Sequence, residues 1–421
     1  MKNVSESLKK GLSPQVLALL KAAGAVAERA GLPLFLVGGT VRDLILGRAL
    51  EDLDLVVEGD ASLLASMMAK DMDGEVIAHS QFSTAKLKIG EMTLDLATAR
   101  SETYRRPGVL PAVMPGTLLE DLARRDFSVN AIAASLSPGD WGTLYDPHGG
   151  IEDIQARLLR VLHDRSFQDD ATRLLRAIRY EIRLGFSLEK DTEKLLRRDT
   201  RFLATIGGDR IRRELERSLN EDSAPEMLYR AEELGILTHI HPALTLDRER
   251  RIALERGKEI PDKERPLFYL AVLAYALQIQ EIPSLITRLK MPARWEKVVR
   301  DTVAVKDISP YLCRADLSAS QLYDCLKDRS PSAVAANLSL SSSPNVQQRL
   351  SLYLNQLRFI KPLLGGRELI RMGVPQGPLV GKLLEELHAA RLNGRVSNRD
   401  DEEEWVRGRL AGLNELGRDK P

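Results

Sequence analysis

Two aspartates at alternating positions, Asp52 and Asp54, have the residue type and spacing of a cation site. On a β-strand, side chains at i and i+2 project to the same face. Two carboxylates held together there repel each other unless a positive charge lies between them. Mg2+ suits that place, because it prefers one or two carboxylates together with phosphate oxygens and water. A bare Asp-x-Asp is more often a solvent-facing strand edge, so the surrounding segments must decide between the two interpretations.

Asp95 supplies a third carboxylate, on another segment with the pattern of a strand, MTLDLATA (92–99). Carboxylates from two strands form the kind of cluster that holds two metal ions for in-line phosphoryl transfer. The spacing therefore indicates phosphate chemistry, provided that the two strands are close together.

Gly38 and Gly39 lie where an apolar run gives way to a helical pattern. Glycines let backbone N–H groups approach a phosphate closely, and a helix N-terminus favours negative charge. Arg42 follows three residues later and is within reach of the same anion. The alternative is a tight strand-to-helix turn that binds no ligand. The pair fits neither the GxGxxG dinucleotide pattern nor the GxxxxGK[ST] phosphate loop, which disfavours those two classes of nucleotide-binding protein.

A helical pattern at 169–186 has charged residues at every third position along one side. They are Asp170, Arg173, Arg176 and Arg179. Apolar residues fall on the opposite side, at Leu174, Leu175, Ile178 and Ile182. The pattern predicts an apolar face packed on the protein and a polar row facing a cleft, where Asp170 and Arg173 offer hydrogen bonds to the edge of a base. A salt-bridged surface helix is the alternative.

A small sheet is needed to position these residues. Apolar and alternating runs predict strands at 32–37, 52–57, 84–90 and 92–99, with a Gly-Glu turn between the last two. Helical periodicity predicts helices at 13–31 and 40–47. The charged, Pro- and Gly-rich stretch 101–117 is expected to be a loop, and helical patterns are nearly continuous from 118 onward. We therefore expect an α+β protein, with a small α/β head followed by a long helical stalk.

Composition narrows the class of protein further. The chain has 421 residues, a formal net charge of +1 and two cysteines, Cys313 and Cys325. No run approaches the roughly 20 apolar residues that span a bilayer, and the N-terminus lacks the apolar segment of a secretory signal. The cysteines lack CxxC or Cys/His spacing, so neither structural zinc nor a disulfide framework is expected. We expect a cytoplasmic protein with no membrane partner.

The glycine pair and the Asp-x-Asp strand belong to one segment, VGGTVRDLILGRALEDLDLVV (37–57). It resembles the signature of the DNA-polymerase-β-like nucleotidyltransferase superfamily. Its form, GG-x-VRD-x-x-LG followed by DxD, is similar to the class II family of tRNA nucleotidyltransferases and bacterial poly(A) polymerases.

Further stretches resemble the same family in the same order. They are RRDFSVNAIA (124–133), YDPHGGIEDIQARLLRVL (145–162), DDATRLLRAIRYEIRLGF (169–186), GGDRIRRELERSL (207–219) and GRELIRMGVPQGPLVGKLL (366–384). The resemblance therefore covers nearly the whole chain.

The resemblance implies a polymerase-β-like head at 1–140 with a mixed sheet, followed by an elongated all-helical part. That part would comprise a base-recognising neck at 141–220, a body at 221–300 and a tail at 301–421 that is expected to bind tRNA. The protein would act as a monomer or a homodimer.

For the chemistry, the resemblance implies that Asp52 and Asp54 bind two Mg2+ ions and that Asp95 completes the catalytic carboxylates. CMP and AMP would be added from CTP and ATP to the 3′ end of tRNA without a nucleic acid template. Asp170 and Arg173 match the residues that select the base. The residues expected to bind nucleotide are Gly38, Gly39, Arg42, Arg125, Asp126, Asn130, Asp170, Arg173, Arg176 and Arg179.

Two departures from the family pattern leave the product open. The usual Glu-Asp-Pro is Asp169-Asp170-Ala171 here, and the third carboxylate lies in LDLATAR, a form that also occurs in members that add only CC or only A. The product is therefore CCA, CC, a single A or a poly(A) tail. The alternative outside enzymology is an RNA-binding protein with an inactive head.

Overall fold

The computed structural model describes residues 3–418 except 49, 51–52 and 81–83. The chain divides into two compact units. Unit 1 comprises Met1–Leu215 and Glu226–Ile240, and unit 2 comprises Glu216–Pro225 and His241–Pro421. The finer division into head, neck, body and tail stays a prediction.

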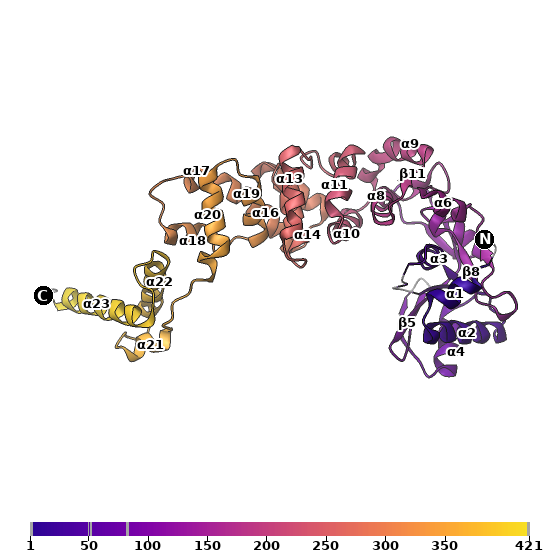
Figure 1. Ribbon diagram of the computed structural model, residues 1–421, viewed down its shortest axis with the longest axis horizontal. Coiled ribbons are helices and arrows are strands. Elements are labelled where there is room, and N and C mark those ends of the chain that lie inside the picture. The colour runs from indigo at the N-terminus through magenta and orange to yellow at the C-terminus, as the bar shows by residue number, and fades with distance from the viewer. Residues whose placement is uncertain (1–2, 49, 51–52, 81–83, 419–421) are drawn as a thin grey trace. The chain divides into compact units, whose positions relative to one another are not determined.

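Unit 1 contains a sheet that includes the strands labelled β5 and β8 in Figure 1. The sheet has seven strands in the order β3-β4-β5-β2-β1-β8-β9. Its strands are β1 (Leu34–Val37), β2 (Asp54–Val57), β3 (Glu75–Ser80), β4 (Thr84–Ile89), β5 (Met92–Thr98), β8 (Ala133–Ser135) and β9 (Leu144–Tyr145). Strands β2 and β5 are parallel, and the other neighbours are antiparallel. The expected mixed sheet is confirmed.

Helices α2 (Pro14–Arg29) and α4 (Ala61–Asp71) pack against each other and against the sheet, α2 on β1 and α4 on β3 to β5. The side chain of Ser13 caps α2 by accepting a hydrogen bond from the Val16 N–H, and Pro14 follows at the first helical position. On β1 and β2, Phe35, Val37 and Val56 pack with α5 (Leu118–Ala123). Because alternate strand residues share a face, Asp54 lies on the same side of β2 as Val56.

The predicted helix 40–47 is α3 (Gly39–Ile45), and the predicted strands correspond to β1, β2, β4 and β5. The loop predicted at 101–117 is wrong in part. Strands β6 (Arg100–Thr103) and β7 (Ala112–Pro115) pair there as a separate two-stranded sheet. The charge that suggested a solvated loop is neutralised locally, since the largely buried Glu102 accepts hydrogen bonds from the guanidinium groups of Arg100 and Arg124.

The chain after residue 118 is not helical throughout. Strands β8 and β9 extend the main sheet, and β9 lies beyond residue 140, where the head was expected to end. Strands β10 (Leu158–Leu159) and β11 (Ser187–Leu188) pair in parallel within the expected all-helical neck. These runs of two or three residues are too short to show a strand periodicity in the sequence.

The rest of unit 1 is helical. Its helices include α6 (Gly150–Ala156), α7 (Ser166–Asp169), α8 (Thr172–Leu184), α9 (Lys190–Asp199) and α12 (Ile236–Ile240). Helices α10 (Gly208–Leu219) and α11 (Ala224–Glu233) contribute residues to both units.

Unit 2 is built from helices. They are α13 (Arg248–Arg256), α14 (Arg265–Ala274), α15 (Ile282–Leu289), α16 (Ala293–Asp307), α17 (Ser309–Leu312), α18 (Ala319–Leu326), α19 (Pro331–Leu340), α20 (Pro344–Asn355), α21 (Gly366–Arg371), α22 (Pro378–Leu392) and α23 (Arg399–Arg418). One apolar cluster includes Leu312 and Leu350, and another includes Leu369 and Leu387. A sheet-containing head followed along the chain by helices confirms the predicted α+β architecture.

No single helix in the described part of the chain has the length and apolar composition needed to cross a membrane. The bent pair Arg265–Ala274 and Ile279–Leu289, with an angle of 114° between its helices, meets that test only as a pair. Residues 267–274 of α14 are buried within the fold. The expected cytoplasmic location stays a prediction.

Candidate active site

Three charged side chains form a row across the main sheet. Asp54 of β2 lies directly opposite Asp95 of the parallel strand β5, and Asp95 lies opposite Lys86 of β4. Directly paired residues project to the same face of a sheet. The Lys86 ammonium is 3.3 Å from a carboxylate oxygen of Asp95. The structure therefore brings together two of the three predicted carboxylates, while Asp52 lies outside the described residues.

The row opens into a cleft of about 540 Å³. Its lining residues are Val37, Asp54, Leu55, Val56, Thr84, Ala85, Lys86, Asp95, Leu96, Ala97, Arg124 and Arg125. Within the described ranges, no group of three or more His, Cys, Asp or Glu side chains is placed to hold a metal ion. Asp54 and Asp95 offer two carboxylates beside open space, a number that suits a divalent ion such as Mg2+, which completes its shell with phosphate and water. The donor set fits a divalent cation.

The glycine pair forms the predicted turn between β1 and α3. Gly38 has φ +69°, and its N–H donates to the carbonyl oxygen of Ile132 at 3.0 Å. A Cβ atom on Gly38 would lie 2.5 Å from Nη1 of Arg125. Glycine is therefore required at this position for two reasons, the positive φ of the backbone and the close approach of the guanidinium group.

Arg125 reaches the cleft from the end of α5. Its Nη2 donates to Asp121 at 2.8 Å and its Nη1 to the carbonyl oxygen of Asn130 at 3.4 Å. Its buried Nε has no hydrogen-bond partner among the described residues. Arg124 also donates to the fully buried Asp121. Burial by itself would raise the pKa of Asp121, but the charges of Arg125 and Arg124 lower it. Asp121 thus fixes both guanidinium groups at the cleft wall.

Three residues of this site were not predicted from the sequence, namely Asp121, Arg124 and Lys86. The spacing of Asp121 from the two arginines, i to i+3 and i to i+4 on a helix, was the signal for the first two residues. Lys86 had no such signal, because its place opposite Asp95 depends on the register between β4 and β5.

Arg42, Asp126 and Asn130 lie behind the turn, in one hydrogen-bonded network. Arg42 is buried, with donors directed at Asp43 and at the side-chain oxygen of Asn130, 2.5 Å away. The amide of Asn130 donates to Asp126 at 3.0 Å. The donors of Arg42 serve the protein interior here, so its predicted contact with a phosphate stays a prediction.

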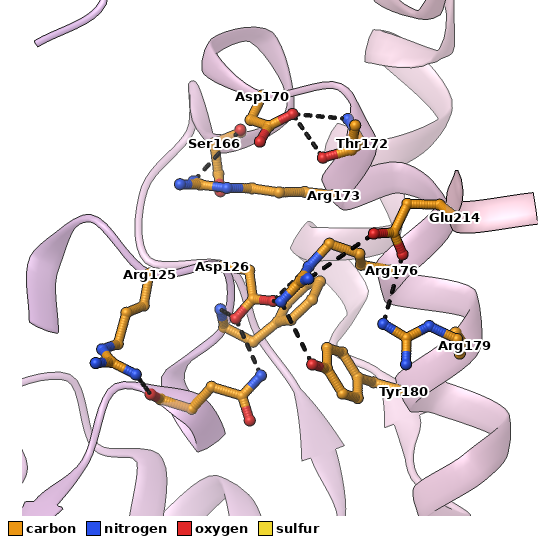
Figure 2. Close-up of polar contacts among 12 residues, drawn as sticks. Arg125, Asp126, Ser166, Asp170, Thr172, Arg173, Arg176, Arg179, Tyr180 and Glu214 are labelled. Carbon is orange, nitrogen blue, oxygen red and sulfur yellow. Dashed lines mark hydrogen bonds and ion pairs between the residues drawn. The ribbon is translucent and has the colours of Figure 1, made fainter. Parts of the chain in front are cut away.

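Asp126 connects this network to α8 (Figure 2). Its Oδ2 accepts hydrogen bonds from Nε and Nη2 of Arg176, at 2.9 and 2.5 Å. Burial by itself would raise the pKa of Asp126, but the charge of Arg176, with hydrogen bonds from Asn130 and Arg176, lowers it to about 2. Asp126 is therefore a buried, ionised anchor.

Asp170 precedes α8 rather than lying on it. Its Oδ1 accepts hydrogen bonds from the N–H and hydroxyl of Thr172, at 2.9 and 2.7 Å (Figure 2), and its Oδ2 pairs with Arg210. The continuous helix predicted at 169–186 is therefore wrong, because Asp170 has an extended backbone at the end of α7 and α8 begins only at Thr172. Arg173, on α8, donates to the hydroxyl of Ser166 at 2.7 Å and to the carbonyl oxygen of Arg124 at 2.6 Å.

The ring of Tyr180, another residue that the sequence analysis missed, lies among three arginines. The guanidinium carbons of Arg42, Arg176 and Arg179 are 5.5, 5.5 and 5.0 Å from its centroid. Arg179 also pairs with Glu214 of α10 at 3.4 Å (Figure 2). Arg176 thus joins α8 to Asp126, and Arg179 joins it to α10. The predicted contacts of both arginines with nucleotide stay predictions.

Two known families match successive parts of this chain. Residues 34–160 match the family described as the poly A polymerase head domain, and residues 185–247 match that of the probable RNA and SrmB-binding site of polymerase A. The chain resembles a CCA-adding enzyme solved in complex with ATP, with a TM-score of 0.80, 30% identity, and coverage of 98% of this chain and 97% of that one.

Two A-adding tRNA nucleotidyltransferases are similar along their sequences. The protein from Geobacter sulfurreducens is 34% identical over 420 residues, which cover 95% of this chain and 48% of the relative. The protein from Halalkalibacterium halodurans is 33% identical over 421 residues, which cover 96% of this chain and 95% of the relative. The chain thus spans about half the length of the first relative and nearly all of the second. It belongs to the family of tRNA nucleotidyltransferases that carry the poly(A) polymerase head.

Proposed function

We propose that this protein transfers nucleotides from ATP and CTP to the 3′ end of tRNA, with release of pyrophosphate. The observation that carries the proposal is the carboxylate pair of Asp54 and Asp95 on adjacent parallel strands, in a cleft whose wall carries Arg125. Family membership supports the acceptor, since both relatives are named as enzymes acting on tRNA.

Asp54 and Asp95 would hold the divalent cation that the family uses, and we propose Mg2+ as that ion, with Asp52 as a further ligand. The bound ion would neutralise phosphate charge and favour ionisation of the RNA 3′-hydroxyl. That hydroxyl would attack the α-phosphorus in line, and pyrophosphate would leave.

Arg125 would bind the triphosphate. Its side chain is 18% exposed and faces the cleft, and Asp121 holds it in place. A guanidinium group that is already oriented stabilises charge on the transferring phosphate without reorganising during the reaction. Gly38 contributes by leaving room for the group.

Asp170 and Arg173 would select the base, as the family resemblance implies. In the structure, Asp170 is paired with Arg210 and Arg173 with Ser166. A base that bound here would replace these partners with its own donors and acceptors. Selection by protein side chains would explain how a defined sequence is added without a template.

Addition of a single A is the second candidate. Two relatives that are 34% and 33% identical, over 95% and 96% of this chain, are named A-adding tRNA nucleotidyltransferases. The LDLATAR segment around Asp95 is also of the form found in partial-specificity members.

Extension of three tRNA transcripts tests both candidates. The transcripts end before CCA, after C and after CC, and each is offered CTP, ATP or both. Full CCA synthesis predicts growth of all three, whereas A addition predicts growth of the CC-ended transcript alone and only with ATP. Long A tracts on RNA other than tRNA would show a poly(A) polymerase. Binding of nucleotide without incorporation would show an inactive head and overturn the proposal.

A further inference from the structure

Lys86 lies in the carboxylate row although neither the predicted chemistry nor the motifs assign it a role. It is the residue of β4 directly opposite Asp95, as Asp54 is the residue of β2 opposite Asp95 on the other side. All three line the cleft that also contains Arg125. A cation thus lies at the place where a divalent ion and a triphosphate would both arrive.

The ion pair between Lys86 and Asp95 is weak enough for each side chain to take another partner. The two side chains are 41% and 47% exposed, and their closest nitrogen–oxygen distance is 3.3 Å. Exposed ion pairs of this kind contribute little, because water screens them and both side chains lose freedom. A divalent ion on Asp95 would repel the ammonium group and free it.

A released Lys86 would still face the cleft. Lysine is a compact charge on a flexible four-carbon stem, so it can change partner without moving the strand that carries it. The phosphates of a nucleotide bound between the carboxylates and Arg125 would be the nearest new anion.

We infer that Lys86 is a counter-ion that changes partner: it pairs with Asp95 in the empty site and with a phosphate oxygen of the nucleotide in the loaded site. This role rests on the proposed function, because it assumes a metal-bound nucleoside triphosphate in the cleft. It makes Lys86 a further nucleotide-binding residue of the reaction.

The role predicts opposite effects of Lys86→Gln on two ligands. Mn2+ alone, titrated by electron paramagnetic resonance, should bind about twofold to fivefold more tightly, because the competing ammonium is gone. ATP with Mg2+, titrated by calorimetry, should bind about tenfold more weakly, because a charge-assisted hydrogen bond to phosphate is lost. Lys86→Arg should restore ATP binding.

Lys88→Gln is the matched control. Lys88 lies two residues along the same strand on the same face, opposite Thr93, and it does not line the cleft. It should leave both affinities unchanged. Weakened binding of both ligands by Lys86→Gln would show a structural role and overturn the inference, as would an unchanged affinity for either ligand.

The tRNA extension assay separates the two proposals. If the wild-type chain extends tRNA and Lys86→Gln leaves the two affinities unchanged, only the role of Lys86 fails. If the chain extends no tRNA but Lys86→Gln binds Mn2+ more tightly and ATP more weakly, the proposal of tRNA as the acceptor is wrong. Lys86 would still be a ligand of bound nucleotide.

Discussion

Arg176 donates two hydrogen bonds to one carboxylate oxygen of Asp126, and this pair joins α8 to the segment that carries Arg125. The charge of Asp126 is the main cause of the raised pKa of Arg176, so both groups remain ionised. The helix expected to recognise the base is therefore anchored next to the residue expected to bind the triphosphate.

Asp126→Asn should lower the free energy of unfolding by about 2 kcal/mol, because it leaves the partly buried charge of Arg176 without its main partner. Urea unfolding followed by circular dichroism measures the loss. Asp191→Asn is the control, since it breaks the fully exposed pair with Lys194 and should leave the stability nearly unchanged. Equal stabilities of the two variants would contradict the anchoring role of Asp126.

The contribution of Asp126 should also depend on pH. Its pKa is lowered from 3.8 to about 2 in the folded chain. A carboxyl group with a depressed folded-state pKa stabilises the fold above the unfolded-state value and loses that contribution as the pH falls through the folded-state value. The difference in stability between the wild type and Asp126→Asn should therefore be constant above about pH 5 and shrink between pH 4 and pH 2. A difference that stays the same down to pH 2.5 would rule out this origin.

The parts of the site that could be predicted from sequence are those that local patterns determine. The alternation of apolar and polar residues around Asp54 and Asp95 predicted their strands. Gly38 and Gly39 predicted the turn before α3. The apolar side of α8 is likewise confirmed at Leu174, Leu175 and Ile178, which are buried.

What could not be predicted depends on contacts between distant segments. Lys86 meets Asp95 only through the strand register, and Arg42 is turned inward by Asn130, a residue 88 positions away. The β6–β7 pair could not be predicted for the same reason. The charge of Glu102 on β6 suggested a loop, but Arg124 from a distant segment forms an ion pair with it. Aspartate is a residue type that favours the segment before a helix over the helix interior, which would have indicated the break at Asp170. The regular spacing of the arginines after it favoured a continuous helix instead.

Asp54→Asn and Asp95→Asn should each lower kcat for AMP incorporation by at least about a hundredfold, because each removes a charge that would hold the cation in the cleft. Both side chains are at least partly exposed, so the free energy of unfolding should change by less than about 0.5 kcal/mol. Single-turnover extension of a tRNA ending in CC measures the rate. Glu91→Gln, at the turn between β4 and β5 outside the cleft, should retain full activity, and retained activity in either aspartate variant would remove that carboxylate from the reaction.

Gly38→Ala should weaken ATP binding because the new methyl group would occupy the space of Arg125 Nη1. The variant also places a Cβ at φ +69° and ψ −131°, a backbone conformation that favours glycine, so it should lose stability by itself. Gly47→Ala separates the two effects. Gly47 also has a positive φ, +67°, but its added Cβ would have no neighbour within 4 Å among the described residues.

Both glycine variants should therefore lose stability from a Cβ at positive φ, and only Gly38→Ala should displace the guanidinium group. We expect the Kd for ATP to rise about tenfold in Gly38→Ala, the loss of one charge-assisted hydrogen bond, and to stay at the wild-type value in Gly47→Ala. Calorimetric titration of ATP with Mg2+ measures both constants. An equal rise in the two variants would mean that backbone strain in the head, rather than the position of Arg125, limits nucleotide binding.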